Sequence, residues 1–250
     1  MAKSLKAFLT YLKNSPELFT HSPVKVVCGN ASADFDSVAS AITYAYCSYQ
    51  KDPQHPIIPI VNIPKVDLSL RRDIVRALDG VCISEDLLFF IEDLQQIRNK
   101  TSSLTAVLVD HNKIEFGVAD CIDNVSGIID HHKDENLYLN ADPRIIETTG
   151  SCSSLVMNYW APHLDDPTSI KDVALLSLSA ALIDTSNFRH KVEQPDLDAL
   201  QIYSRLLPSI DREEHYNKIR RDKDDLDGLT IQEILRKDYK QFLFETAGKN

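Results

Sequence analysis

The sequence contains no long hydrophobic run and no closely spaced pair of cysteines. No apolar segment approaches the roughly 18 residues of a membrane-spanning helix. Lysines interrupt the apolar positions near the N-terminus, so a secretory signal is not expected either. The five cysteines are widely separated and include no CxxC pair, which argues against a disulfide framework or a zinc knuckle. These absences predict a cytoplasmic protein with reduced thiols.

Basic residues are also comparatively few. Lysine and arginine number 27 against 37 aspartates and glutamates, and the formal net charge is −10. A chain with this charge does not attract nucleic acid or an anionic membrane, so we expect neither as a partner. An anionic substrate would need a local group of cations or bound metal ions. We expect a monomer, although no feature of the sequence specifies the oligomeric state.

Short apolar segments alternate with helical patterns along the first part of the chain. Strands are predicted at residues 24–29, 57–63, 87–91, 104–109, 125–129 and 144–146, and helices at about 3–13, 38–49, 67–78, 151–160, 170–185, 196–207, 212–222 and 230–240. This alternation is typical of an α/β fold with a doubly wound, mainly parallel sheet flanked by helices. Pro56 and Pro59 indicate that the second strand starts late or lies at an edge.

Acidic side chains follow three of the predicted strands. Asp34 and Asp36 come after the first strand, Asp110 follows the strand at 104–109, and Asp130-His131-His132 follows the strand at 125–129. The carboxyl ends of parallel strands meet at one edge of a sheet, so these side chains are expected to converge there. Asp184 ends an apolar helix, where an unpaired carboxylate would be costly.

Carboxylates that are brought together repel one another unless cations neutralise them. Mixed oxygen and nitrogen donors suit Mg²⁺, Mn²⁺ or Co²⁺ better than a structural zinc ion. Two such ions about 3.5–4 Å apart can stabilise both the attacking and the leaving oxygen of a phosphoryl group. Taken singly, Asp34 and Asp36 could equally cap a helix, and Asp184 could form a buried salt bridge. Neighbouring side chains diverge in an extended segment, so His131 and His132 are expected to have different roles.

Four segments resemble, in order and approximate spacing, the motifs of the DHH phosphoesterase superfamily. They are Asn-Ala-Ser-Ala-Asp-Phe-Asp-Ser at 30–37, Leu-Val-Asp-His-Asn at 108–112, Gly-Ile-Ile-Asp-His-His at 127–132 and Leu-Ile-Asp-Thr-Ser-Asn at 182–187. Within the superfamily the chain most resembles fungal exopolyphosphatases, with prune-type proteins and family II inorganic pyrophosphatases more distant. The resemblance implies a DHH domain over residues 1–225, with residues 226–250 as the start of a truncated C-terminal domain that closes over the active site.

The resemblance also implies a set of ligands and a reaction. Asp34 and Asp110 would bind one divalent ion, while Asp36, Asp110, His131 and Asp184 would bind a second. The ions would be Mg²⁺ or Mn²⁺, with Co²⁺ as a further candidate. Asp110, as the shared ligand, and His132, as a phosphate contact, would be the catalytic residues. Water activated between the ions would attack the terminal phosphorus of inorganic polyphosphate and release orthophosphate.

One position departs from the superfamily pattern. Asn30 stands where a metal-ligating histidine is common, and an amide oxygen is a harder, weaker ligand that favours Mg²⁺. Exopolyphosphatases share this asparagine, so the resemblance favours polyphosphate over pyrophosphate, with Asn30 as a candidate substrate contact. Arg144 and Arg189 are further candidates, because guanidinium groups match phosphate geometry. Arg71 and Arg72 are also candidates, although an ordinary surface charge is the more common role for any single one of these arginines.

Other functions remain open from the sequence. Inorganic pyrophosphatase and nucleotide phosphodiesterase are alternative activities for the same site. A non-catalytic, prune-like interaction protein is an alternative of another class, and the short C-terminal part favours it while the full ligand set opposes it. Whether so short a chain turns over its substrate is also open. The remaining histidines are predicted to be surface residues, namely His21, His55, His163 and His215.

Overall fold

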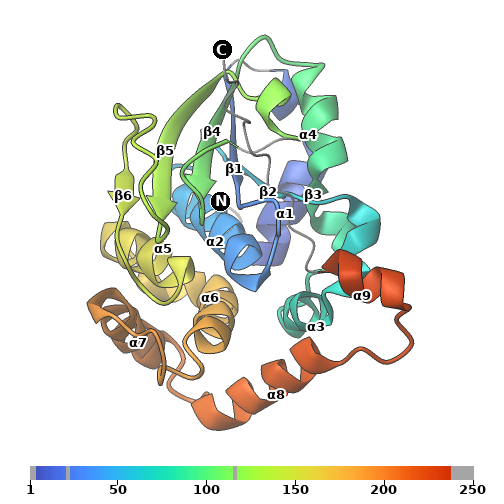
Figure 1. Cartoon of the computed structure of the whole chain (residues 1–250). Helices are drawn as coiled ribbons and strands as arrows, with labels where there is room; N and C mark the ends of the chain where they lie inside the picture. The colour runs from blue at the N-terminus through green and yellow to red at the C-terminus, as the bar shows by residue number, and fades with distance from the viewer. Residues whose placement is uncertain (1–3, 21–22, 115–116, 238–250) are drawn as a thin grey trace, which may run out of the picture.

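The computed structural model of the chain describes residues 4–20, 23–114 and 117–237. At its centre lies a six-stranded sheet with the order β3-β2-β1-β4-β5-β6 (Figure 1). The strands are β1 (Val24–Cys28), β2 (Ile58–Val61), β3 (Phe89–Phe90), β4 (Leu104–Val109), β5 (Asn124–Asp130) and β6 (Arg144–Ile146). Every neighbouring pair is parallel, which confirms the predicted α/β fold.

The direction of the strand order reverses beside β1. The chain runs outward from β1 to β2 and β3, and then returns to place β4 on the other side of β1. Loops that leave the strands on either side of such a switch point diverge, and the carboxyl ends of the strands line a crevice there. The segments after β1 and β4 carry Asp34 and Asp110. The topology therefore brings both acidic segments to the crevice.

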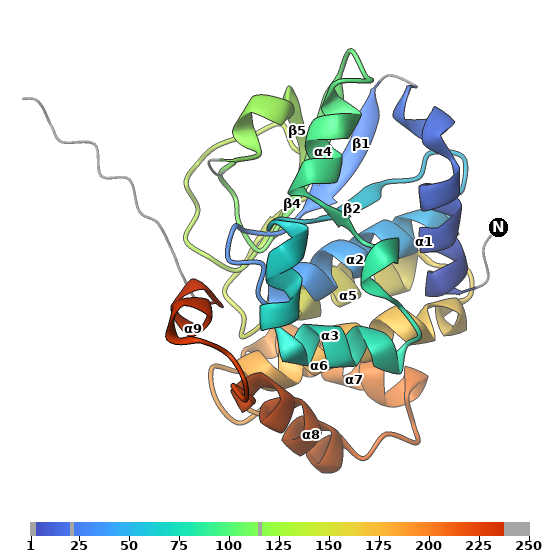
Figure 2. The same ribbon diagram turned by 90° about the vertical axis from the view of Figure 1, so that its right-hand side faces the viewer.

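Helices cover the sheet in layers. They are α1 (Leu5–Asn14), α2 (Phe35–Lys51), α3 (Arg72–Gly80), α4 (Ile91–Arg98), α5 (Cys152–Trp160), α6 (Lys171–Asp184), α7 (Gln194–Leu206), α8 (Arg212–Asp224) and α9 (Ile231–Lys237). Both α2 and α5 contact the sheet, and α6 packs on both of them. The helix α7 packs on α5 and α6, and α8 packs on α6 and α3. Figure 2 shows both on the side of the molecule away from the sheet. The second half of the chain thus builds a second helical layer.

The helix α2 is the centre of the packing. Asp34 caps its N-terminus, because the Asp34 side chain accepts a hydrogen bond of 3.1 Å from the Ser37 N–H. Residues 35–49 are all buried, since the sheet covers one side of the helix and α5 and α6 cover another. Phe8 of α1 contacts Tyr46 of α2, with ring centroids 5.7 Å apart. Tyr44, Tyr46 and Tyr49 are all buried, so the tyrosines of α2 are part of the core.

The strand predicted at 87–91 is present but shorter than predicted. Only Phe89 and Phe90 pair with β2 as strand β3, and α4 begins directly after them at Ile91, where no helix was predicted. The Phe90 N–H donates a 2.8 Å hydrogen bond to Asp93, which satisfies a backbone group at the start of α4. A short apolar run does not distinguish a buried strand from the start of a buried helix. The cap at Asp93 is the local feature that marks the boundary.

The suggestion that β2 lies at an edge is also wrong. This strand lies between β1 and β3. It starts at Ile58, one residue later than predicted, which agrees with the alternative of a late start. Pro59 pairs with Val27 of β1, whereas β3 pairs only with Ile60 and Val61 of β2. The proline therefore lies in the part of β2 that has a neighbour on one side only, where a missing N–H is tolerated.

The boundary predicted near residue 225 falls between α8 and α9. The helix α9 contacts the 3-10 helix Lys65–Leu70, and Arg236 Nη2 lies 3.0 Å from Asp67 Oδ1. Residues 238–240, which were predicted to extend this last helix, lie outside the described residues. Among the helices that the structure describes, none has the length and hydrophobicity that a membrane span requires.

Candidate active site

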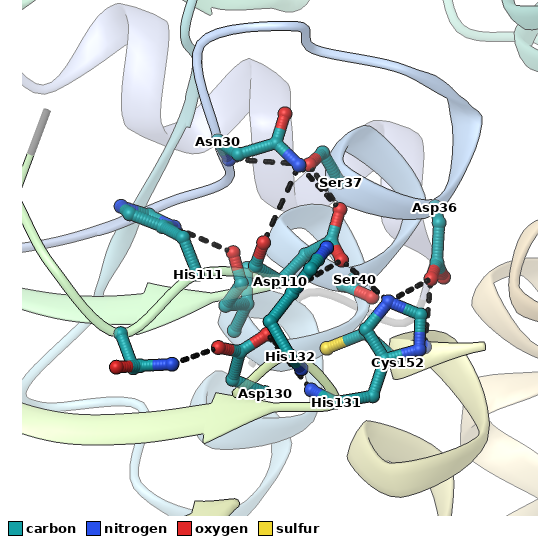
Figure 3. A network of polar contacts seen from close by, with 12 residues as sticks. Asn30, Asp36, Ser37, Ser40, Asp110, His111, Asp130, His131, His132 and Cys152 are labelled. Carbon is teal, nitrogen blue, oxygen red and sulfur yellow. Dashed lines mark hydrogen bonds and ion pairs between the residues drawn. The ribbon is translucent and has the colours of Figure 1, made fainter. Parts of the chain in front are cut away.

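Asp110 is the centre of a polar network at the carboxyl end of β4 (Figure 3). Its backbone has a φ of +61°, a left-handed conformation that aspartate tolerates better than most residues. Its side chain is buried, and Oδ2 accepts hydrogen bonds from Ser37 Oγ at 2.6 Å and Asn30 Nδ2 at 2.8 Å. Oδ1 lies 3.1 Å from His131 Nε2. One carboxylate oxygen is thus held by neutral donors, while the other faces the histidines.

His131 presents a defined nitrogen to this site. Its Nδ1 lies 3.0 Å from the carbonyl oxygen of Thr149, which can only accept a hydrogen bond, so Nδ1 carries the proton. Nε2 lies 3.1 Å from Asp110 Oδ1 and 4.0 Å from Asp36 Oδ2. In the neutral imidazole the lone pair is therefore on Nε2, which points toward the carboxylates and is suited to a metal ion.

Asp130 is fully buried and organises the two histidines. Its Oδ1 accepts hydrogen bonds from the backbone N–H of His131 at 2.8 Å and of His132 at 3.2 Å, and from His132 Nδ1 at 2.8 Å. Asn112 Nδ2 donates to Oδ2. Burial raises the pKa of Asp130, but the hydrogen bonds from His132 and Asn112 outweigh it, and the pKa lies below its usual value. Asp130 is thus a stable anion beneath His132.

The two imidazoles diverge less than the sequence predicts. Their ring centroids lie 4.6 Å apart in an edge-to-face arrangement. They differ in their partners and exposure, because His131 faces Asp110 while the His132 side chain is 55% exposed and hydrogen-bonded to Asp130. Ligand atoms of Asp110, His131 and His132 all lie within 4.8 Å of one another. This distance permits a single cation to contact more than one of them.

Asp36 lies within α2 but contacts the start of another helix. Its carboxylate accepts hydrogen bonds from the N–H groups of Cys152 and Ser153, at 2.7 and 2.8 Å, and from Ser151 Oγ at 2.8 Å. The capping alternative for Asp34 and Asp36 is therefore realised by both, with Asp34 on α2 and Asp36 on α5. Capping does not exclude metal binding, since each carboxylate oxygen has two lone pairs.

Burial, reinforced by the charges of neighbouring carboxylates, raises the pKa values of Asp110 and Asp184. Burial raises the pKa of Asp110 to about 7, and the negative charges of Asp36 and Asp34 add to this effect. Burial and the charges of Asp36, Asp34 and Asp110 raise the pKa of Asp184 well above its usual range. Burial lowers the pKa of His131, but its hydrogen bond with Asp110 and the nearby charges outweigh burial and raise it to about 10. A site of this kind needs added positive charge, and its oxygen and imidazole donors fit divalent metal ions.

Comparison with known proteins agrees with this geometry. The profile of the DHH family, N-terminal domain, matches residues 25–181. The chain belongs to the DHH family. Most of the candidate site lies inside the matched segment, namely Asp34, Asp36, Asp110, Asp130, His131 and His132. Asp184 lies just beyond its end.

Several DHH relatives carry the names of phosphoanhydride hydrolases. A Schizosaccharomyces pombe protein, provisionally named exopolyphosphatase, is 34% identical over 92% of this chain and 63% of its own length. Exopolyphosphatase PRUNE1 of Homo sapiens is 29% identical over 87% of this chain and 49% of its own length. A manganese-dependent inorganic pyrophosphatase of Methanothrix thermoacetophila is 26% identical over 87% of this chain and 65% of its own length. This chain therefore spans about half to two thirds of these relatives.

A solved structure shows the same fold. A Methanococcus jannaschii protein, provisionally described as a family II inorganic pyrophosphatase, superposes with a TM-score of 0.58. The superposition covers 80% of this chain and 61% of the other, at 21% sequence identity. At that identity the likeness concerns the arrangement of strands and helices alone.

The candidate arginines of this DHH chain have protein partners. Arg144 Nη2 lies 2.6 Å from Asp134, and Arg189 Nη2 lies 2.6 Å from Glu213. Arg71 is buried and donates to the carbonyl oxygens of Ala33 and Ser32, so it braces the loop that leads to Asp34. Asn30 directs Nδ2 to Asp110, while its Oδ1 accepts hydrogen bonds from the N–H and hydroxyl groups of Ser32. The amide oxygen thus faces its own turn, not the carboxylate cluster.

Some residues of the site were missed by sequence reasoning. Ser37 and Asn112 were quoted within motifs but given no role, and their hydrogen bonds to Asp110 and Asp130 are now evident. Gly29 is needed for close approach, because a Cβ there would lie 2.6 Å from Ser37 Cβ. A small residue between a strand and a capped helix is the signal that could have identified this contact. Thr149 acts through its backbone carbonyl, which no side-chain pattern reveals.

Proposed function

We propose that this chain is the metal-dependent catalytic part of an exopolyphosphatase, which releases orthophosphate from the end of inorganic polyphosphate. The observation that carries the proposal is the convergence of Asp110, His131 and His132, with ligand atoms within 4.8 Å, beside Asp36. This donor set matches divalent cations, and such cations act chiefly on phosphoryl or carbonyl oxygens. The names of the DHH relatives support the phosphoanhydride as substrate.

In this proposal two Mg²⁺ or Mn²⁺ ions are held by the acidic cluster. Asp34 and Asp110 would hold one, and Asp36, Asp110, His131 and Asp184 would hold the other. When bound, the ions would neutralise the phosphoryl oxygens and lower the pKa of the attacking water. Asp110 would be the ligand common to both ions, and its position supports this role, since Oδ1 faces His131 and a hydrogen bond from Ser37 orients the carboxylate. The raised pKa values of Asp110 and Asp184 support a cation-binding role, since cations would relieve the same repulsion.

His132 is the proposed phosphate contact. The hydrogen bond with Asp130 raises the pKa of His132 above its usual value, because this effect outweighs the opposing effect of burial. The imidazole is therefore more readily a cation, and its exposed side chain can donate a proton or a hydrogen bond to a phosphoryl oxygen. Asp130 orients the ring through Nδ1, which leaves Nε2 for the substrate. Arg144 and Arg189 remain proposed contacts for more distant phosphates, provided that they leave Asp134 and Glu213.

The preference for polyphosphate over pyrophosphate rests on Asn30. Its amide N–H donates to Asp110, so this position supplies a hydrogen bond where an imidazole would supply a ligand. The ion nearest Asn30 would therefore have a harder donor set, which favours Mg²⁺. The alternative is an inorganic pyrophosphatase, which the name of the Methanothrix relative favours.

Side-by-side hydrolysis assays test the proposal. Orthophosphate release is measured from medium-length polyphosphate and from pyrophosphate, and AMP formation is measured from cyclic AMP, each with Mg²⁺ and with Mn²⁺. We expect polyphosphate to be cleaved fastest, and Asp110→Asn to abolish the release. Asp120→Asn is the matched control, because Asp120 is an exposed aspartate of the 3-10 helix Ala119–Cys121 outside the site. Faster cleavage of pyrophosphate would make the chain a pyrophosphatase, AMP formation as the fastest reaction would make it a phosphodiesterase, and no hydrolysis of any substrate would support a non-catalytic role.

A further inference from the structure

A single peptide group joins the candidate metal centre to a carboxylate on another helix. The carbonyl oxygen of Thr149 accepts a 3.0 Å hydrogen bond from His131 Nδ1. The N–H of Gly150 donates a 2.8 Å hydrogen bond to Asp196 Oδ2. These two groups belong to the same planar amide, because the Thr149 carbonyl carbon is bonded to the Gly150 nitrogen. His131 and Asp196 are therefore connected through one rigid unit.

Asp196 is a fully buried carboxylate whose hydrogen-bond partners all belong to the protein. It lies in the first turn of α7 and is 0% exposed. Its Oδ1 accepts a hydrogen bond from Ser154 Oγ at 2.8 Å, and Oδ2 accepts a second one from the Glu193 N–H at 3.0 Å. A buried carboxylate is costly unless hydrogen bonds replace its lost hydration, and here three donors do so. The residue lies outside the segment that matches the DHH family and in none of the four motifs.

Gly150 is the residue that permits the approach. A Cβ at this position would lie 3.0 Å from Asp196 Oδ2 and closer still to the Lys191 carbonyl and the Thr185 side chain. Any larger residue at position 150 would push Asp196, Thr185 and Lys191 away from the Thr149–Gly150 peptide. The glycine and the buried carboxylate are two separate observations, and both indicate that this contact is tightly fitted.

The physical consequence concerns His131. An anion that accepts a hydrogen bond from the amide N–H polarises the peptide group and makes its carbonyl oxygen a stronger acceptor. A stronger acceptor at Nδ1 fixes the tautomer and the ring orientation, and it raises the donor strength of Nε2 toward a metal ion. We propose that Asp196 is a positioning residue that acts on His131 through the Thr149–Gly150 peptide. The metal-affinity part of this inference rests on the proposed function.

Asp196→Asn tests the proposal with little change of shape. The asparagine oxygen can accept from Gly150 and Glu193, and its NH₂ group can donate to Ser154 Oγ, so only the negative charge is lost. Ser154→Ala is the matched control, because it removes a hydrogen bond of the same carboxylate and leaves the Gly150 contact intact. A role limited to packing or capping predicts the same behaviour for both variants.

Two readouts report on His131. In nitrogen-15 NMR spectra of the metal-free protein at fixed pH, we expect the Nδ1 proton of His131 to move upfield and exchange faster in Asp196→Asn. By titration calorimetry we expect about 10-fold weaker Mn²⁺ binding, the usual scale for loss of a group that supports a ligand. Ser154→Ala should leave both readouts at their wild-type values.

A folded Asp196→Asn protein with an unchanged Nδ1 proton and unchanged Mn²⁺ affinity would overturn the inference. If this variant does not fold, the wild-type protein still decides, through the scalar coupling between His131 Nδ1 and the Thr149 carbonyl carbon. Absence of that coupling would remove the link. Neither readout uses polyphosphate, so a different substrate would contradict the proposed function without affecting this inference.

Discussion

The carboxylate of Asp36 accepts a 2.7 Å hydrogen bond from the backbone N–H of Cys152, the first residue of α5. The contact joins the N-terminus of α5 to the first turn of α2, and a helix N-terminus favours a negative charge. The same Oδ2 atom lies 4.0 Å from His131 Nε2. One carboxylate thus both supports the packing of two helices and faces the candidate metal centre.

This double role predicts the stability of an Asp36 variant. Asp36→Ala leaves the N–H groups of Cys152 and Ser153 without their acceptor, so we expect the free energy of unfolding in EDTA to fall by about 2 kcal/mol. Asp34→Ala removes a single, exposed cap and should cost about 1 kcal/mol. Urea unfolding measures both. Equal or greater stability for Asp36→Ala would show that relief of charge repulsion with Asp110 dominates.

The two adjacent histidines should differ in their effect on metal binding and turnover. His131→Gln should weaken Mn²⁺ binding by at least about 10-fold, because it removes the nitrogen that faces Asp110. His132→Gln should keep the metal affinity near that of the wild type and lower kcat by about 100-fold, as expected for a donor to a developing negative charge. Calorimetry and steady-state kinetics separate the two. Identical losses of affinity would assign both rings to the metal.

Asn30→His tests the basis for the substrate preference. The change replaces an amide that donates to Asp110 with an imidazole that can bind a transition metal. We expect tighter Mn²⁺ binding and a higher ratio of pyrophosphate to polyphosphate hydrolysis. The measurement is kcat/KM for both substrates at saturating Mn²⁺. If neither affinity nor ratio changes, the argument from Asn30 for polyphosphate fails.

His215, which lies outside the candidate active site, should make the stability of the protein depend on pH. The sequence predicts a surface residue, as found for His55 and His163, but His215 is half-buried and its Nε2 lies 2.8 Å from Ser179 Oγ on α6. His21 lies outside the described residues. Burial, with a smaller contribution from the charge of Lys218, lowers the pKa of His215. The unfolded chain therefore binds the proton more readily than the folded protein.

It follows that His215 makes the free energy of unfolding fall as the pH drops below the unfolded value of about 6.5. His215→Gln retains a hydrogen-bond donor for Ser179 but cannot be protonated. We expect urea unfolding at pH 5.5 and 7.5 to show a smaller difference for this variant than for the wild type. An unchanged difference would show that protonation of His215 does not contribute.

The location of the site was predictable because it depends on strand ends. Apolar runs followed by acidic residues place Asp110 and Asp130 at the carboxyl end of parallel strands, and β6 was predicted with the bounds that the structure has. The error at residues 87–91 arose because five apolar residues have no diagnostic period. The boundary between β3 and α4 depends instead on the cap at Asp93 and on the short pairing of β3 with β2.

The arginines show why partners are harder to predict than ligands. Arg144 and Arg189 were candidates because their charge suits phosphate, yet the structure pairs them with Asp134 and Glu213. Arg71 has a buried structural contact with the carbonyl groups of Ser32 and Ala33. The type of side chain limits what it can bind, but its actual partner depends on which elements pack beside it.

The sequence by itself determined the α/β class, the order of the motifs and the chemical identity of the candidate ligands, because these depend on local pattern and residue type. Only the tertiary structure decided which atoms face one another. The contact of Asp36 with α5 and that of Asp196 with the Thr149–Gly150 peptide join segments far apart in the chain. Both contacts arise from helix packing around α5, which the amino-acid pattern of no single segment encodes.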